Sequence, residues 1–196
     1  ALHTAVNRSF NMISVDGDSS TNDTVLLFSN AASDSAIIAH DSPHAAVFQD
    51  ALDKLCIYLA KEIVKDGEGA TKLIEVTVDK AKTFEDARRA AKAIVSSTLV
   101  KTAVHGADPN WGRIMMALGN SGAQVDEAKV SLYLNDVCIY DVDEGPIAYH
   151  KDAVVAIMQG ESISLLVTLN AGDASATAWG CNLSEEYVTF NSAYTT

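Results

Sequence analysis

Residues 15–30, with the sequence VDGDSSTNDTVLLFSN, constrain the fold more than any other part of the chain. A run of nine small or acidic residues, 16–24, stands directly against the apolar run 25–28. Ser, Asp and Asn side chains compete with helical hydrogen bonds and Gly17 lowers helix propensity, so the segment cannot lie inside a helix. We therefore expect a hydrogen-bonded loop that leads into a buried strand. The loop is either a plain solvated turn or the edge of an active site.

A calcium site in this loop is excluded by spacing. Four oxygen-bearing residues occupy the first, third, fifth and seventh places of an EF-hand pattern, namely Asp16, Asp18, Ser20 and Asn22. The sixth place holds Thr21 where glycine is needed, and the twelfth holds Leu27 where glutamate is needed. The cysteines are also far apart and lack C-x-x-C spacing, which argues against zinc. We expect no metal.

The bulk composition limits the class of protein and its partners. A chain of 196 residues with 48% hydrophobic residues can bury one substantial core. Its net charge of -12 makes nucleic acid and anionic membranes poor partners. We find no signal peptide and no apolar run of about 18 residues, and the three cysteines suit reduced thiols. These features predict a cytoplasmic, soluble protein.

The periodicity of apolar residues predicts alternating helices and strands. Helices are expected over residues 2–13, 42–65, 83–105, 110–118 and 151–159, and strands over residues 25–29, 73–78, 129–134, 137–141, 162–170, 174–181 and 187–191. The pattern indicates an α+β fold in which mixed sheet layers are covered by helices. We divide it into a helix-and-strand core, residues 1–125, and a smaller strand-rich part, residues 126–196.

The first predicted helix has no capping residue. Its apolar stripe begins at Leu2, and Ala1 ahead of it offers no side-chain oxygen to the free N–H groups. We therefore expect the chain to continue upstream of Ala1 in the intact protein.

The glycine-rich stretch DGEGATK, residues 66–72, is a candidate binding turn. Gly67 and Gly69 can each adopt a positive φ, so one ends the preceding helix and the other lets the backbone turn Glu68 outward. The stretch differs from a phosphate-binding P-loop, because no glycine precedes Lys72 and the four-residue spacer is missing.

Four stretches together resemble a known family. They are FNMISVDGDSSTNDTVLLFSN, DGEGATK, KTAVHGADPNWGRIMMALGNSG and ATAWGCNLSEEYVTFNSAYTT. The chain is similar, from the first helix to the last residue, to the β chain of the ornithine acetyltransferases, the bifunctional glutamate/ornithine N-acetyltransferases of arginine biosynthesis. The resemblance implies a layered α/β sandwich completed by a separate α chain, with an α2β2 assembly.

The resemblance also implies a reaction. Members of this family cut their own precursor and free an N-terminal threonine, which accepts acetyl from N2-acetylornithine, releases ornithine and passes the acetyl group to glutamate. No cofactor is needed, although acetyl-CoA is a possible donor. Ala1 has no nucleophile and Thr4 lies in the predicted helix, so we expect the threonine within about twenty residues upstream of Ala1. The oxyanion donors are expected on the α chain.

Three residues of this chain take substrate-binding roles by the same resemblance. Glu68 matches the acidic residue that binds the amino acid, and Asn191 and Thr196 match the C-terminal contacts to its carboxylate and amine. The ordinary alternatives are a solvated loop glutamate and a frayed tail. The 15–24 loop and residues 108–110 are expected either to support the site or to serve as a plain turn and cap. We assign no role to four of the histidines, His40, His44, His105 and His150.

Two other functions remain open. A self-processing aminopeptidase or amidohydrolase of related fold would release the acyl group to water, and a non-catalytic subunit would only bind its partner.

Overall fold

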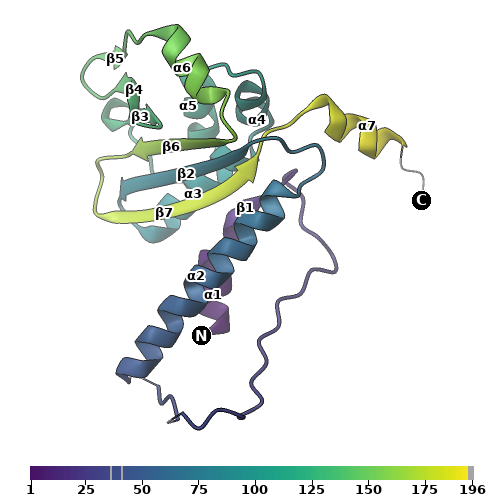
Figure 1. Cartoon of the computed structure of the whole chain (residues 1–196). Coiled ribbons are helices and arrows are strands. Elements are labelled where there is room, and N and C mark those ends of the chain that lie inside the picture. The colour runs from purple at the N-terminus through teal and green to yellow at the C-terminus, as the bar shows by residue number, and fades with distance from the viewer. Residues whose placement is uncertain (36, 41, 194–196) are drawn as a thin grey trace.

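The computed structural model describes residues 1–35, 37–40 and 42–193. Within them the chain forms one seven-stranded mixed sheet with the strand order β1-β7-β2-β6-β3-β4-β5 (Figure 1). The strands are β1 (Ile13–Ser14), β2 (Leu73–Ala81), β3 (Ser131–Leu134), β4 (Val137–Asp141), β5 (Gly145–Pro146), β6 (Ser162–Thr168) and β7 (Ala174–Cys181). The predicted α+β class is confirmed.

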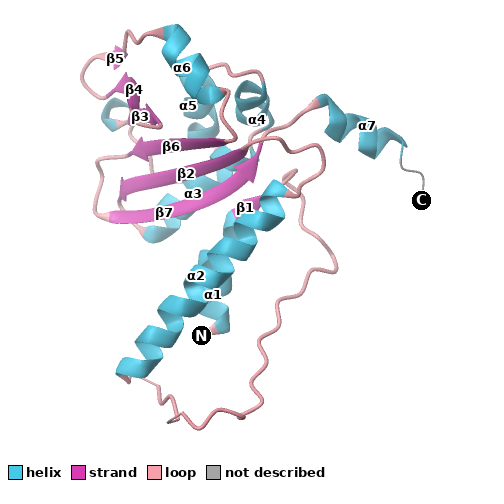
Figure 2. Ribbon diagram, in the orientation of Figure 1, coloured by secondary structure: helices cyan, strands magenta, loops and turns pink. Residues whose placement is uncertain are grey.

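The helices pack mainly on one face and at one edge of the sheet, as Figure 2 shows. They are α1 (Leu2–Arg8), α2 (Pro43–Lys65), α3 (Phe84–Ser96), α4 (Thr98–His105), α5 (Trp111–Gly119), α6 (Lys151–Met158) and α7 (Glu185–Ala193), with short 3-10 turns at Phe10–Met12 and Glu127–Lys129. Helix α3 packs on β2 and β7. Helices α1 and α2 pack together and project from the β1 edge, and α7 stands apart from the sheet (Figure 1).

Strand β2 lies between β6 and β7 and forms the longest pairings of the sheet with them. It runs parallel to β6 and antiparallel to β7, and β1 runs parallel to β7 on the other side. On β2, Ile74, Val76 and Val78 are fully buried, whereas the alternating residues Glu75 and Thr77 are only half-buried. This alternation makes one face of the strand the core beneath α3.

The outer face of the same strand carries a polar contact to α2. The Lys61 ammonium donates to the Glu75 carboxylate at 2.5 Å, and the Trp179 indole N–H donates to the same carboxylate at 2.7 Å. Burial alone would raise the pKa of Glu75, but these two donors outweigh it and hold the pKa below its ordinary value. The network therefore joins α2 to the sheet through an ionised carboxylate.

The expected strand at residues 25–29 is wrong. That segment belongs to a long loop between β1 and α2, and Phe28 is 85% exposed. A strand needs a neighbouring strand to satisfy its backbone groups, and the chain has already left the sheet edge after the two residues of β1. The apolar run is therefore not buried within the described residues.

The expected helix over residues 83–105 is broken in two. Thr83 caps α3 as predicted, but Ser97 leaves the helical conformation and its hydroxyl accepts from the Val100 N–H to cap α4. The sequence contains a signal for this break, because residues 96–98 are two serines and a threonine, and such side chains favour helix caps over helix interiors.

The last expected strand, residues 187–191, is also wrong, because this segment lies in helix α7. Both edges of β7 are already occupied by β1 and β2, so no neighbouring edge is available there. Glu185 and Glu186 in the first turn instead favour a helix start through the helix dipole.

The expected helix over residues 2–13 ends early: Ser9 leaves the helical conformation after α1, a 3-10 turn covers Phe10–Met12, and Ile13 already belongs to β1.

The remaining expectations are confirmed within small shifts of their ends. Ser42 caps α2, which ends at Lys65, and residues 135–136 form the turn between β3 and β4. The boundary between residues 125 and 126 stays a prediction, although strands from both sides of it pair in the one sheet. Cys56, Cys138 and Cys181 are free thiols.

None of the helices in the described part of the chain combines the length and the apolar composition needed to cross a bilayer.

Replacing Ile94, which is fully buried in α3, tests the core. Ile94→Ala should lower the free energy of unfolding by about 2 to 5 kcal/mol, because it removes apolar contacts and leaves a cavity. Ile94→Val should cost about 0.5 to 1.5 kcal/mol, because it removes one methylene. Urea unfolding measures both values, and equal costs for the two variants would contradict this packing.

Candidate active site

Three segments far apart in the sequence meet at one end of the sheet. Ser14 pairs with Gly180 in parallel strands, and Leu73 pairs with Cys181 in antiparallel strands. The loop after β1, the turn before β2 and the residues after β7 therefore leave the sheet at the same end. This pairing brings the DGEGATK turn next to the VDGD loop and to α7.

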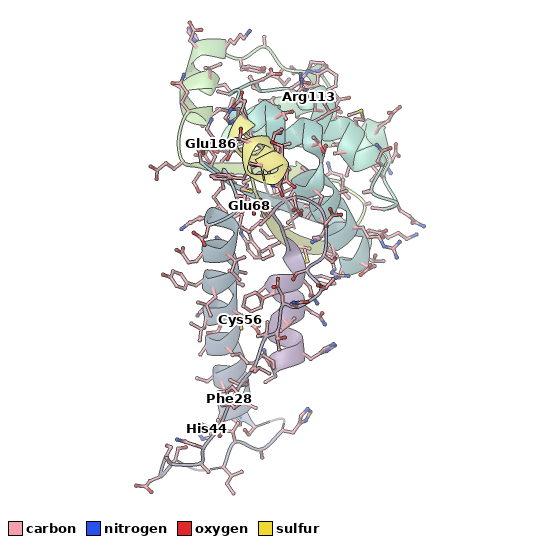
Figure 3. All side chains as sticks on the ribbon, turned by 90° about the vertical axis from the view of Figure 1, so that its right-hand side faces the viewer. Phe28, His44, Cys56, Glu68, Arg113 and Glu186 are labelled. Atoms are coloured by element: carbon pink, nitrogen blue, oxygen red, sulfur yellow. The ribbon has the colours of Figure 1, made fainter. Side chains whose placement is uncertain are left out.

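Glu68 and Asn191 are in direct contact at this end. The Asn191 side-chain N–H donates to the Glu68 carboxylate at 2.6 Å and to the Tyr187 carbonyl at 3.0 Å. Both side chains are on the surface. Figure 3 shows Glu68 beside α7, which carries Asn191. Thr196, the third predicted residue, lies outside the described residues.

The two glycines of the turn have different roles. Gly69 has φ +67°, and a Cβ there would lie 2.6 Å from the Ser184 hydroxyl and 2.7 Å from the Tyr187 nitrogen. Gly67 does not have the expected positive φ, but a Cβ there would lie 2.9 Å from the Val15 side chain. Gly69 thus permits the close approach of α7, and Gly67 permits the close approach of the loop after β1.

Asn182 connects the DGEGATK turn to helix α4 through hydrogen bonds of its side chain. It is 2% exposed, and its side-chain oxygen accepts from the Thr71 N–H at 2.9 Å and the Lys72 N–H at 2.8 Å. Its side-chain nitrogen lies 2.8 Å from the Thr71 hydroxyl and 2.9 Å from Nδ1 of His105. A buried amide with all of these partners fixes the backbone that follows Glu68.

Two lysines are also held at this end of the sheet. The Lys72 ammonium donates to the carbonyls of Val104, His105 and Met158, which close helices α4 and α6. The Lys101 ammonium donates to the Cys181 carbonyl and is 2% exposed. Burial lowers the pKa of both lysines. Cations at helix C-termini are favourable, which explains the placement of Lys72.

The loop after β1 contacts α7 through one hydrogen bond. The Tyr187 hydroxyl donates to the Asp16 carboxylate at 3.3 Å, and burial together with the charge of Asp16 raises the pKa of Tyr187. This part of the loop therefore lies at the site. In residues 108–110, the predicted cap is shifted, because Asn110 rather than Asp108 caps α5 by accepting from the Arg113 N–H.

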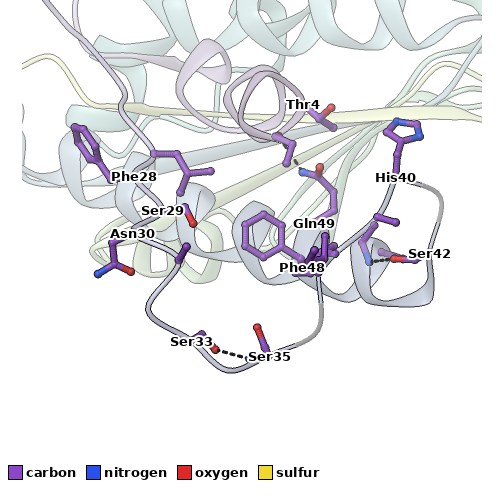
Figure 4. Close-up of a pocket in the computed structure, with 18 of the residues that line it drawn as sticks. Thr4, Phe28, Ser29, Asn30, Ser33, Ser35, His40, Ser42, Phe48 and Gln49 are labelled. Atoms are coloured by element: carbon purple, nitrogen blue, oxygen red, sulfur yellow. Dashed lines mark hydrogen bonds between the residues drawn. The ribbon is translucent and has the colours of Figure 1, made fainter.

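A separate hollow lies between the loop before α2 and the first turns of that helix (Figure 4). Its described lining residues are apolar or neutral, and several make local bonds, such as the Ser33 hydroxyl accepting from the Ser35 N–H. They include no Asp, Glu, Lys or Arg side chain. The hollow therefore offers mainly apolar surface and none of these four charged side-chain types to an amino acid substrate.

Four residues at this end of the sheet were not predicted from the sequence, namely Lys72, Lys101, His105 and Asn182. All four belong to the motifs that carried the family resemblance or directly adjoin them, but their partners lie 32 to 111 residues away. His105 was given no role, whereas its ring joins Asn182 to Glu185. In the described residues, no group of three or more His, Cys, Asp and Glu side chains is arranged to hold a metal ion.

Comparisons with known proteins identify the relatives of this chain. A family model described as "ArgJ family" matches residues 1–196. The chain is 49% identical to the "Arginine biosynthesis bifunctional protein ArgJ" of Symbiobacterium thermophilum and 44% identical to that of Bacillus subtilis. Each match covers 100% of this chain and 48% of the relative. The chain thus spans about half the length of the curated relatives it matches.

A solved structure agrees with these matches. The crystal structure of the arginine biosynthesis bifunctional protein argJ from Bacillus halodurans has a TM-score of 0.95 and 39% sequence identity to this chain. The match covers 98% of this chain and 91% of that one. The family resemblance found in the sequence is confirmed.

Gly69→Ala tests the close approach of α7. The variant should lower the free energy of unfolding by more than Gly122→Ala does, because both sites have a positive φ but only Gly69 has atoms in the place of the new Cβ. The strain of a positive φ alone costs about 1 to 2 kcal/mol. Urea unfolding measures both variants, and equal losses would contradict the contact between the turn and α7.

Lys101→Met tests the buried cation through pH. The pKa of Lys101 is lower in the folded chain, so the unfolded chain binds more protons between that lowered pKa and about pH 10.4, and this lysine makes stability rise with pH in that window. The difference in free energy of unfolding between wild type and Lys101→Met should therefore change in favour of wild type from pH 7 to 10. Lys54→Met, at an exposed lysine, is the control. A difference that does not vary with pH would contradict the assignment.

Proposed function

The chain belongs to the ArgJ family, and from this premise we propose that it is the β chain of an N-acetyltransferase of arginine biosynthesis. The proposed enzyme moves an acetyl group from N2-acetylornithine to glutamate through an acetyl-threonine intermediate. The contact between Glu68 and Asn191 carries the proposal, because it joins two residues that the family resemblance marks as substrate-binding and that lie 123 positions apart.

The orientation of the Asn191 amide supports an ammonium ligand. Its nitrogen lies against two acceptors, the Glu68 carboxylate and the Tyr187 carbonyl, so both of its hydrogens are directed to them. The Asn191 oxygen then points away from these contacts and can accept. The Glu68 carboxylate and the oxygen of the neighbouring Asn191 amide are both acceptors, which suits the amine of an amino acid. We assign Glu68 and Asn191 to that amine, and Thr196 to the substrate carboxylate.

The acyl transfer itself needs groups beyond this chain. A threonine hydroxyl attacks the acetyl carbonyl, a nearby base takes its proton, and N–H donors stabilise the tetrahedral oxyanion. We propose that the threonine lies upstream of Ala1 and is freed by self-cleavage, and that the α chain supplies the oxyanion donors. The half-length match to the curated relatives supports a second half of this kind.

The wider setting follows the same proposal. The α and β chains would form an α2β2 assembly in the cytoplasm. The reaction needs no cofactor, because a hydroxyl nucleophile carries the acetyl group, and acetyl-CoA would be a second donor in a bifunctional enzyme.

The proposed reaction is tested with the complete protein that contains both halves. Incubation with N2-acetylornithine and glutamate should yield N-acetylglutamate and ornithine in equal amounts, measured by mass spectrometry. Acetate without N-acetylglutamate would favour the aminopeptidase or amidohydrolase reading, and no turnover would favour a non-catalytic subunit. An intact-mass measurement of the same sample should show two chains, and the C-terminal cleavage product, which contains this sequence, should begin with a threonine.

Glu68→Gln tests the residue that binds the amine. The variant keeps the shape of the side chain but loses the charge, and a hydrogen bond to a charged group contributes about 1.5 to 3 kcal/mol. The value of kcat/KM for N2-acetylornithine should therefore fall about ten- to hundredfold. Glu186→Gln, an exposed acid on α7, should leave it unchanged. Equal kinetics of Glu68→Gln and wild type would remove Glu68 from the site.

A further inference from the structure

Polar side-chain contacts join helix α7 to the rest of the protein, together with the close approach of its first turn to Gly69. The helix contains no buried residue. Its described side-chain contacts to other segments are those of Glu185 with His105, Tyr187 with Asp16, and Asn191 with Glu68. Because no buried apolar surface holds the helix, each of these contacts has a large share in placing Asn191.

The ring of His105 is fixed from its inner side. The oxygen of the Asn182 amide accepts from two backbone N–H groups, so the nitrogen of that amide must face Nδ1 of His105 at 2.9 Å. An amide N–H is a donor, which makes Nδ1 the acceptor. The backbone of His105 is held as well, because its carbonyl accepts from Lys72.

The outer nitrogen of the same ring then has a defined role. With Nδ1 accepting, the proton of the neutral ring resides on Nε2. Nε2 lies 3.1 Å from the carboxylate of Glu185, the first residue of α7 (Figure 3 shows α7 from its exposed side). The ring therefore donates from the fixed part of the protein to the start of the helix.

We propose that His105, held in its Nε2–H form by Asn182, is a positioning residue that fixes α7 through Glu185 and thereby sets Asn191 against Glu68. The positioning of α7 stands on the hydrogen bonds alone, whereas its consequence for substrate binding rests on the proposed function. The alternative is that His105 only stabilises α4 as a basic residue in its last turn. That role does not depend on which ring nitrogen carries the proton.

The tautomer is tested directly by NMR on the complete protein with ¹⁵N-labelled histidine rings. His105→Gln identifies the resonances of His105 by their loss. In the neutral ring, the Nδ1 shift should be that of an unprotonated nitrogen and the Nε2 shift that of a protonated one. The reverse assignment would overturn the proposal.

Two substitutions of His105 separate its two nitrogens. His105→Gln can place an amide N–H near Nε2 and keep the donor to Glu185, whereas His105→Asn can replace only the acceptor Nδ1. Amide hydrogen exchange across residues 185–193 should therefore be about two- to tenfold faster in His105→Asn, the loss expected for one hydrogen bond, and nearer to wild type in His105→Gln. Unchanged exchange in His105→Asn, or equal exchange in both variants, would overturn the proposal.

A double-mutant cycle tests the partner on α7. Glu185→Ala should speed the same exchange as much as His105→Asn does, and the double variant should add little, because both remove one contact. Glu186→Ala removes the neighbouring carboxylate, which makes no hydrogen bond or ion pair within the described residues, and should leave exchange unchanged. Fully additive effects of the two changes would overturn the assigned contact.

Kinetics then connect this contact to the substrate site. In His105→Asn, KM for N2-acetylornithine should rise several-fold while kcat changes less, because Asn191 meets Glu68 in a smaller share of molecules. Faster exchange of α7 with an unchanged KM would support the positioning of α7 by His105 and contradict the proposed role of Glu68 and Asn191. Hydrogen exchange therefore tests the positioning of α7 by His105, and KM tests the proposed role of Glu68 and Asn191 in substrate binding.

Discussion

The pairing of β2 between β6 and β7 is the constraint on which the candidate site depends. Because β2 is antiparallel to β7, the turn that enters β2 lies beside the residues that leave β7. Because β1 is parallel to β7, the loop that leaves β1 arrives at the same end. A register shift of one residue would send alternate side chains to the opposite face, so the buried residues of β2 and β6 that fix the register also fix the site.

Hydrogen-bonded polar groups fix the backbone at the end of the sheet where β2 begins and β7 ends. Removing Asn182 and Lys101 from water, and Lys72 in part, carries a cost that only well-placed partners offset. A buried polar group left unpaired costs about 1 to 3 kcal/mol. Asn182 meets this requirement with two backbone N–H groups, a hydroxyl and an imidazole, and Lys72 with three carbonyls. Such groups accept few alternative arrangements, which is why the turn that presents Glu68 can be on the surface and yet have a defined backbone.

The sequence predicted local features well where a single segment decides them. Ser42 and Thr83 cap their helices as expected, since a cap needs only the residues next to it. The strands expected at residues 25–29 and 187–191 failed because a strand depends on a free edge elsewhere in the sheet. In the site, Glu68 and Asn191 were found through family resemblance, and their contact spans 123 residues. No local pattern of charge or periodicity marks His105 or Asn182, because their roles arise only when β2, α4 and the end of β7 meet.

The distribution of apolar surface adds a physical argument for the proposed second half of the enzyme. Ile37 is 93% exposed and Phe28 is 85% exposed in the loop before α2, and that helix carries further exposed apolar residues, such as Tyr58 and Leu55. A monomeric protein rarely leaves so much apolar surface in water, because each buried Å² of it is worth roughly 25 cal/mol. The helical arm formed by α1 and α2 thus has the character of an interface, whereas the turn with Glu68 and the first turn of α7, with Glu185 and Glu186, carry acidic side chains that suit a small polar substrate. The two surfaces lie on different segments, so a partner chain can cover the apolar arm without covering the turn that presents Glu68.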